Sequence, residues 1–121
     1  AATATGATVV LTYSVPYGTL ALDSANVRSY PQSGFRFVDS TDEKAISNVV
    51  VSAPNQVTLT LASASTGTGK TVYYGTTPHL EPRQASTVPG GNLRDSSGEI
   101  WKSTLDGQRL DCWAEHQAFT I

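Results

Sequence analysis

The octapeptide ASTGTGKT, residues 64–71, differs at one position from a phosphate-binding loop. That motif requires a glycine ahead of its Gly-Lys-Thr, at the position that Ala64 occupies here. A phosphate-binding loop also joins a buried parallel strand to a helix whose N-terminus binds the phosphates. Here QVTLTL precedes the octapeptide and alternates like an antiparallel strand, and TVYYG favours a second strand directly afterwards. We therefore predict a hairpin connection, with Gly67 and Gly69 at positive φ, rather than a nucleotide site.

Two histidines, His79 and His116, and the single cysteine, Cys112, are further side chains whose types could support catalysis or bind a metal. A serine hydrolase with parallel strands would need a Gly-x-Ser-x-Gly turn, and the sequence contains none. A structural zinc ion requires more ligands than these three side chains provide. We therefore expect His79 at the surface, His116 hydrogen-bonded near the last strand, and no catalytic residue, metal or cofactor.

Three carboxylates occur close together in DSTDE, residues 39–43, where Asp39, Asp42 and Glu43 could offer oxygen ligands to calcium. Their spacing is not that of an EF-hand loop. Asp is also typical of turns, in which its side chain accepts hydrogen bonds from the following backbone N–H groups. The turn is the interpretation that we favour.

The composition indicates one soluble domain and excludes several classes of protein. The chain has 121 residues, a net charge of −2 and no cluster of basic residues, so the footprint of a nucleic-acid-binding protein is missing. It contains no long apolar run, which argues against a membrane protein. The first residues, AATATGA, resemble the end of a linker. We expect residues 1–7 to be a linker remnant of a longer polypeptide and residues 8–121 to form a single domain.

Short segments with alternating apolar residues predict an all-β fold. They are TVVLTYS from Thr8, GFRFV from Gly34, ISNVVVS from Ile46, QVTLTL from Gln56, TVYYG from Thr71 and HQAFTI from His116. Turn residues at short spacing separate most of them, which is typical of an antiparallel β-sandwich of the jelly-roll or immunoglobulin-like kind. Residues 76–109 form one long irregular region, and a short helix near residues 21–27 is a weaker prediction.

The long irregular region contains the side chains best suited to bind a ligand. Trp101 lies among polar residues, where an exposed indole would offer a flat partner to the C–H face of a sugar; an indole folded over the edge of the core is the open alternative. Asn92, Arg94 and Asp95 could recognise a ligand, but we favour a structural role in which they tie the loop to the sandwich. The candidate ligand-binding residues are Trp101, His79, Arg83 and Glu99.

The order of three segments resembles a known family of domains. GFRFVDSTDEKAISNVVVSAPNQVTLTLASASTGTGKTVYYG, then GGNLRDSSGEIW, then LDCWAEHQAFTI are similar to the C-terminal β-sandwich accessory domain that follows SGNH-type carbohydrate esterases. This domain type includes those of sialate O-acetylesterase-like enzymes and of phage and prophage tail proteins. The likeness covers residues 34–121 and is carried by the strands around NQVTLTL, the YYG strand end and the GNLRDS loop followed by a tryptophan.

The resemblance implies a non-catalytic accessory domain that in some members binds carbohydrate. It also implies that Asn92, Arg94 and Asp95 define a loop, whereas residues 99–108 depart from the family's pattern. We accordingly expect a carbohydrate-binding module that targets an attached carbohydrate-active enzyme or phage tail protein to glycans, with sialylated and acetylated glycans among the candidates. Such a module would be extracellular or virion-associated. The alternative is a structural or interaction domain that packs on a neighbouring catalytic domain or subunit.

Overall fold

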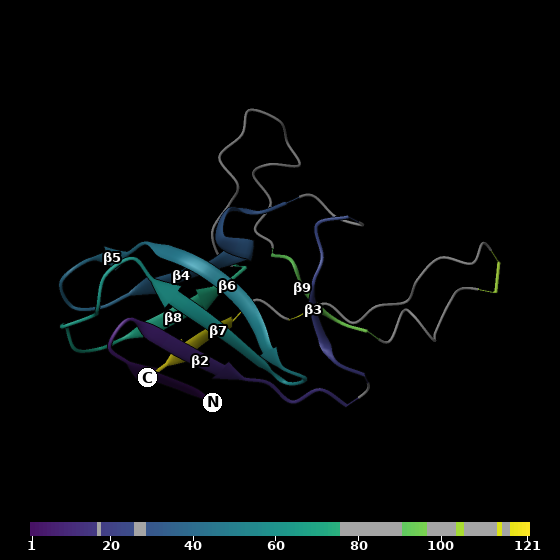
Figure 1. Ribbon diagram of the computed structural model, residues 1–121, viewed down its shortest axis with the longest axis horizontal. Coiled ribbons are helices and arrows are strands. Elements are labelled where there is room, and N and C mark those ends of the chain that lie inside the picture. The colour runs from purple at the N-terminus through teal and green to yellow at the C-terminus, as the bar shows by residue number, and fades with distance from the viewer. Residues whose placement is uncertain (17, 26–28, 76–90, 97–103, 106–113, 115–116) are drawn as a thin grey trace.

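The computed structural model describes residues 1–16, 18–25, 29–75, 91–96, 104–105, 114 and 117–121 (Figure 1). Within these ranges the chain is built from β-strands and one short 3-10 helix, η1. The elements are β1 (Ala2–Thr5), β2 (Thr8–Thr12), β3 (Leu20–Leu22), η1 (Pro31–Gly34), β4 (Phe35–Val38), β5 (Glu43–Lys44), β6 (Ile46–Ala53), β7 (Gln56–Leu61), β8 (Thr71–Tyr74), β9 (Leu93–Asp95) and β10 (Gln117–Thr120).

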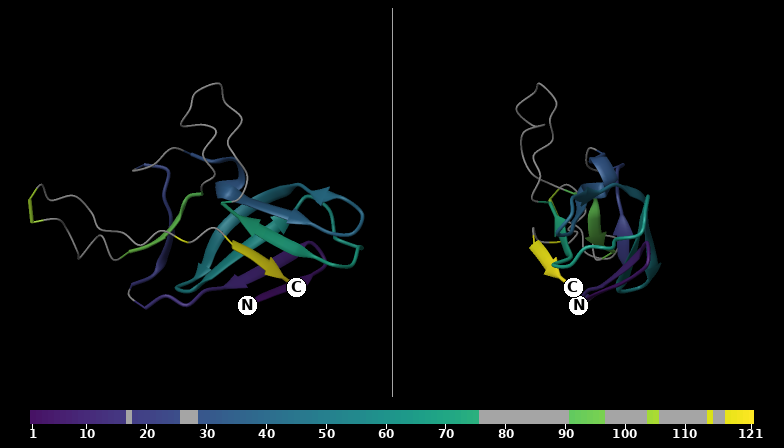
Figure 2. Two further views of the ribbon diagram at one scale, coloured as in Figure 1. Left: turned by 180° about the vertical axis from the view of Figure 1, so that it is seen from behind. Right: turned by 90° about the vertical axis from the view of Figure 1, so that its left-hand side faces the viewer.

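In the described part of the chain, the strands form two larger sheets and one small ribbon. The first sheet has the order β1-β2-β7-β6, the second has the order β10-β8-β4-β5, and β3 pairs with β9 in the ribbon. The pairings are antiparallel. Figure 1 shows the ribbon at one end of the larger sheets, and both views in Figure 2 show the two termini near each other. The predicted all-β, antiparallel class is confirmed.

Each sheet buries one face, as the alternation in the sequence predicts. In β7, Val57, Leu59 and Leu61 are buried, whereas Thr58 and Thr60 between them are partly exposed. The buried side chains of both sheets form a single hydrophobic cluster, which also includes Val9, Leu11, Phe35, Phe37, Val72, Tyr74 and Leu93. The predicted facing of these strands is thereby confirmed. The sandwich arrangement itself, with its jelly-roll or immunoglobulin-like topology, stays a prediction.

The connection between β7 and β8 is not the hairpin that the sequence suggested. β7 pairs with β2 and β6 in the first sheet, whereas β8 pairs with β4 and β10 in the second. The prediction was wrong because alternation identifies a strand but not its neighbour. Gly69 has the expected positive φ, of 58°, but Gly67 does not. A Cβ atom at Gly67 would instead collide with the carboxylate of Asp39.

Two further expectations about local structure are revised. Residues 2–5, within the segment expected to be a linker remnant, form β1 and pair with β2 from Ala2–Leu11 to Thr5–Thr8. The segment therefore contributes a strand to the first sheet. The weak helix prediction near residues 21–27 is wrong at its start, because Leu20–Leu22 form β3 and pair with β9.

We predict that Phe37→Ala lowers the free energy of unfolding by about 3–5 kcal/mol, because it empties a buried site at the centre of the second sheet. Val50→Ala is the matched control, since Val50 is 41% exposed on β6, and its effect should stay within about 0.5 kcal/mol. Urea unfolding of the two variants measures both effects. Equal losses would show that Phe37 does not belong to the core.

Candidate functional site

The sequence-predicted site residues divide into two groups. The candidate ligand-binding residues His79, Arg83, Glu99 and Trp101 lie outside the described residues, as do Cys112 and His116. The three predicted loop-structuring residues, Asn92, Arg94 and Asp95, are described and are all buried in or next to β9. In the sequence, they lie between the segments that contain the candidate ligand-binding residues.

Asn92 connects β9 to two distant segments of the chain. Its side-chain Nδ2 donates to the backbone oxygen of Asp23 at 2.8 Å, and its Oδ1 accepts from the backbone N–H of Tyr30 at 2.9 Å. The backbone of Asn92 also donates to Ser33 and accepts from Asp23. These are the contacts of a residue that holds the backbone in place.

Arg94 forms a buried ion pair with Asp23. Its Nε lies 2.7 Å from Asp23 Oδ2, and its Nη1 donates to the backbone oxygen of Asp95 at 2.7 Å. The other carboxylate oxygen of Asp23 accepts from the backbone N–H of Ala25 at 2.8 Å. A buried ion pair loses hydration on both partners, and removal of one partner leaves the other charge without compensation. The pair thus constrains the β3–β9 ribbon.

Tyr74 joins the ribbon to the second sheet. Its hydroxyl accepts from the backbone N–H of Leu93 at 2.9 Å and lies 3.5 Å from the Leu93 oxygen, to which it can donate. Burial raises the pKa of Tyr74 to about 12, so the hydroxyl keeps its proton at neutral pH. A Cβ atom at Gly91 would collide with the Tyr74 ring. The close approach of the backbone at residue 91 therefore requires glycine.

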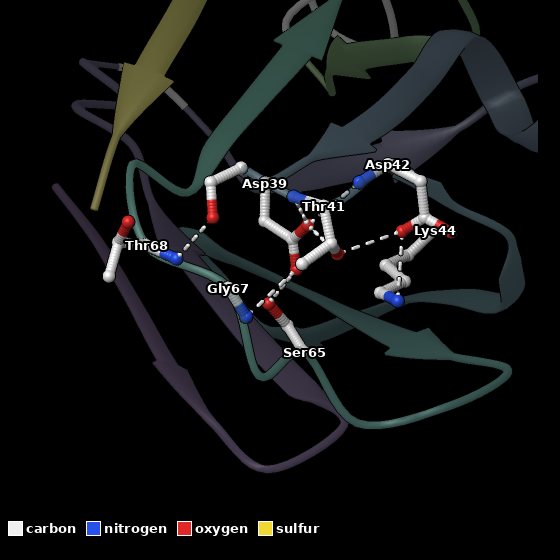
Figure 3. A network of polar contacts seen from close by, with 8 residues as sticks. Asp39, Thr41, Asp42, Lys44, Ser65, Gly67 and Thr68 are labelled. Atoms are coloured by element: carbon white, nitrogen blue, oxygen red, sulfur yellow. Dashed lines mark hydrogen bonds and ion pairs between the residues drawn. The ribbon is translucent and has the colours of Figure 1, made fainter.

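Asp39 binds the turn after β4 to the segment between β7 and β8 (Figure 3). Its Oδ1 accepts from the backbone N–H groups of Thr41 and Asp42 at 2.8 and 3.1 Å and from the Thr41 hydroxyl. Its Oδ2 accepts from the hydroxyl of Ser65 and from the N–H of Gly67. The predicted turn, with aspartate side chain to backbone hydrogen bonds, is confirmed.

The carboxylates of DSTDE have separate partners. Asp42 pairs with Lys44 at 2.9 Å, and Glu43 pairs with Arg36 at 2.8 Å. In the parts of the chain that can be described, no group of three or more metal-binding side chains comes together. In the octapeptide, the N–H of Thr68 donates to Ser40 Oγ at 2.9 Å, so this N–H is engaged within the protein.

The exposed face of the second sheet brings together residues that sequence reasoning did not select. Strand register places Arg36, Tyr73 and Ala118 in one row and Glu43, Val38, Thr71 and Thr120 in the next. We call these seven outward-facing residues the Tyr73 face. Their neighbours Phe37, Val72 and Tyr74 point into the core.

The centre of the Tyr73 face is an aromatic ring beside an ion pair. The Arg36 Cζ lies over one face of the Tyr73 ring, 5.7 Å from the ring centroid. The guanidinium also donates to both carboxylate oxygens of Glu43, at 2.8 and 3.1 Å. Ala118, opposite Tyr73 on β10, is exposed and contributes only a methyl group. The face can therefore offer a ligand a flat apolar surface, hydroxyl groups and both signs of charge.

Comparisons of the chain with protein-family models, with curated proteins and with solved structures returned no match. The resemblance to accessory domains of carbohydrate esterases stays a prediction from the sequence. No helix within the described ranges is long and apolar enough to cross a membrane.

We predict that Arg94→Met lowers the free energy of unfolding by about 3–5 kcal/mol, since it removes the guanidinium that is paired with the buried Asp23 carboxylate. Arg36→Met removes the same kind of side chain from an exposed pair and should cost at most about 1 kcal/mol. Urea unfolding at neutral pH compares the two variants. Similar losses in both would contradict a special role for the buried pair.

We also predict that Asp39 makes stability depend on pH. Hydrogen bonds from Ser65 and then Thr41 hold the pKa of the Asp39 carboxyl well below its usual range. Its contribution is therefore present above about pH 4, the range of an unfolded aspartate, and is lost as pH falls through the lower folded pKa.

The Asp39→Asn variant should be less stable than the wild type at pH 7, and the difference should shrink as pH falls below about 4. Urea midpoints at several pH values measure this difference. A difference that does not change with pH would contradict the assignment, because other carboxyl groups titrate equally in both proteins.

Proposed function

We propose that this protein is a non-catalytic carbohydrate-binding module that targets an attached carbohydrate-active enzyme or phage tail protein to glycans. The Tyr73 face is the observation that supports the proposal most directly. It combines a partly exposed aromatic ring with the Arg36–Glu43 pair and with the threonines Thr71 and Thr120. This is the mixture that an amphipathic sugar ring requires from its binding site.

Physical chemistry explains why such a surface suits a sugar. One face of a pyranose ring presents C–H groups, which pack on an aromatic ring, while its hydroxyl groups need hydrogen-bond partners at the edge. A shallow site of this kind binds weakly. Weak binding is still useful on a glycan-covered surface, because the linked enzyme or tail protein is held at a high effective concentration.

The proposal keeps the sequence-predicted ligand-binding residues as additional contacts. These residues were predicted from the sequence alone, independently of the Tyr73 face; they are Trp101, His79, Arg83 and Glu99. The proposed setting is extracellular or virion-associated, with a glycan and an attached catalytic domain as partners. An enzyme activity of this domain is not part of the proposal.

A structural or interaction domain is the second candidate function, and strand β6 is the observation that favours it. β6 is an eight-residue edge strand of the first sheet, and Val50 on it is 41% exposed. Edge strands carry backbone groups that can pair with another chain. Irregular register near both ends of β6 leaves its middle as the part suited to such pairing.

A glycan-array screen of the full chain tests the first candidate function. We expect selective binding that Tyr73→Ala weakens by about tenfold or more, which corresponds to about 1.4 kcal/mol. Val50→Ala, on the other sheet, is the control and should bind like the wild type. A parallel Trp101→Ala variant tests whether the long region contributes.

The outcome also separates the two candidate functions. Absence of binding to every glycan would contradict the carbohydrate-binding proposal and favour the interaction domain. Binding that Tyr73→Ala leaves unchanged would contradict the Tyr73 face as the site. Thermal unfolding of each variant verifies that it is folded.

A further inference from the structure

The charges on the Tyr73 face cancel each other. Arg36 and Glu43 are the only charged residues among the outward-facing residues of this sheet that the structure describes. Their bidentate contact, at 2.8 and 3.1 Å, lowers the pKa of Glu43 and raises that of Arg36. Both groups therefore stay ionised at neutral pH, and the charges of the described residues on the Tyr73 face sum to zero.

The ion pair still has unused hydrogen-bonding capacity. Contact through Nε and Nη2 leaves N–H donors on the Arg36 guanidinium, and the Glu43 carboxylate retains acceptor sites. A sugar hydroxyl both donates and accepts a hydrogen bond. Two neighbouring hydroxyls could thus bind to the pair without separating its members.

An anionic sugar meets a different situation at the same place. Its carboxylate could reach Arg36 only beside the Glu43 carboxylate, where like charges repel, or by replacing Glu43 in the bidentate contact. Lys44, the next residue on β5, lies in register with the inward-facing Phe37 and pairs with Asp42 at 2.9 Å, so it does not belong to the Tyr73 face. The described charges of this region therefore favour an uncharged ligand.

We propose that the Tyr73 face binds a neutral pyranose unit, with its C–H face on the Tyr73 ring and two adjacent hydroxyls on the Arg36–Glu43 pair. This inference rests on the proposed carbohydrate-binding function. It narrows the ligand from glycans in general, sialylated glycans included, to neutral sugars. It also assigns Glu43 as the residue that determines this specificity.

Matched pairs of ligands test the inference. Each pair consists of a neutral hexoside and the corresponding hexuronoside, in which a carboxylate replaces the hydroxymethyl group. Calorimetric titration of the full wild-type chain should show a preference of about tenfold or more for the neutral member. In Glu43→Gln the repulsion is removed and Arg36 is released, so the preference should disappear or reverse. Tyr73→Ala should weaken binding of both members.

Asp42→Asn is the matched control, because it removes the same charge at the neighbouring position, where the carboxylate pairs with Lys44 instead. Its preference should equal that of the wild type. Both variants alter exposed ion pairs and should remain folded, which thermal unfolding verifies.

Failure of the inference and failure of the proposed function give different results. Wild-type binding that favours the hexuronoside, or a neutral preference that Glu43→Gln leaves intact, would overturn the inference while carbohydrate binding still stands. Absence of binding to both the matched pairs and the glycan array would overturn the proposed function and the inference with it.

Discussion

Burial of one face of each large sheet in a common hydrophobic cluster is the constraint on which the structure depends. The chain must pass from one sheet to the other between β7 and β8, and this crossing cannot use the backbone hydrogen bonds of a hairpin. Backbone polar groups near the core need partners all the same. Asp39 provides them, because its carboxylate accepts from groups on both the turn after β4 and the crossing segment.

The same constraint leaves the outer faces free to differ. On the first sheet, the outward-facing residues of β2 and β7 are mainly threonines, including Thr8, Thr58 and Thr60, without an aromatic ring among them. On the second sheet, Tyr73 and the Arg36–Glu43 pair occupy the equivalent positions. Because the inward positions alone determine packing, the outward positions of β4, β5 and β8 can specialise for a ligand without disturbing the core.

The sequence predicts what depends on neighbouring residues and misses what depends on distant pairing. The alternation of GFRFV correctly places Phe35 and Phe37 inside and Arg36 outside. That of QVTLTL correctly places Val57, Leu59 and Leu61 inside. β1 was missed because ATAT has no large apolar residue to mark a strand. The contact of β3 with β9 and the position of β8 beside β4 join segments far apart in the chain, which no local period records.

At the candidate site, too, the sequence predicts the local facing of a residue but not its distant neighbours. Period two already places Tyr73 outward, between the inward Val72 and Tyr74, but its meeting with Arg36 requires the pairing of β8 with β4. A shift of β8 by one residue would put Tyr73 in the core and Tyr74 outside. The Tyr74 hydroxyl opposes that shift, because it is hydrogen-bonded to Leu93 of a ribbon that the buried Arg94–Asp23 pair constrains. The position of the exposed ring thus depends on polar contacts made on the buried side of the same strand.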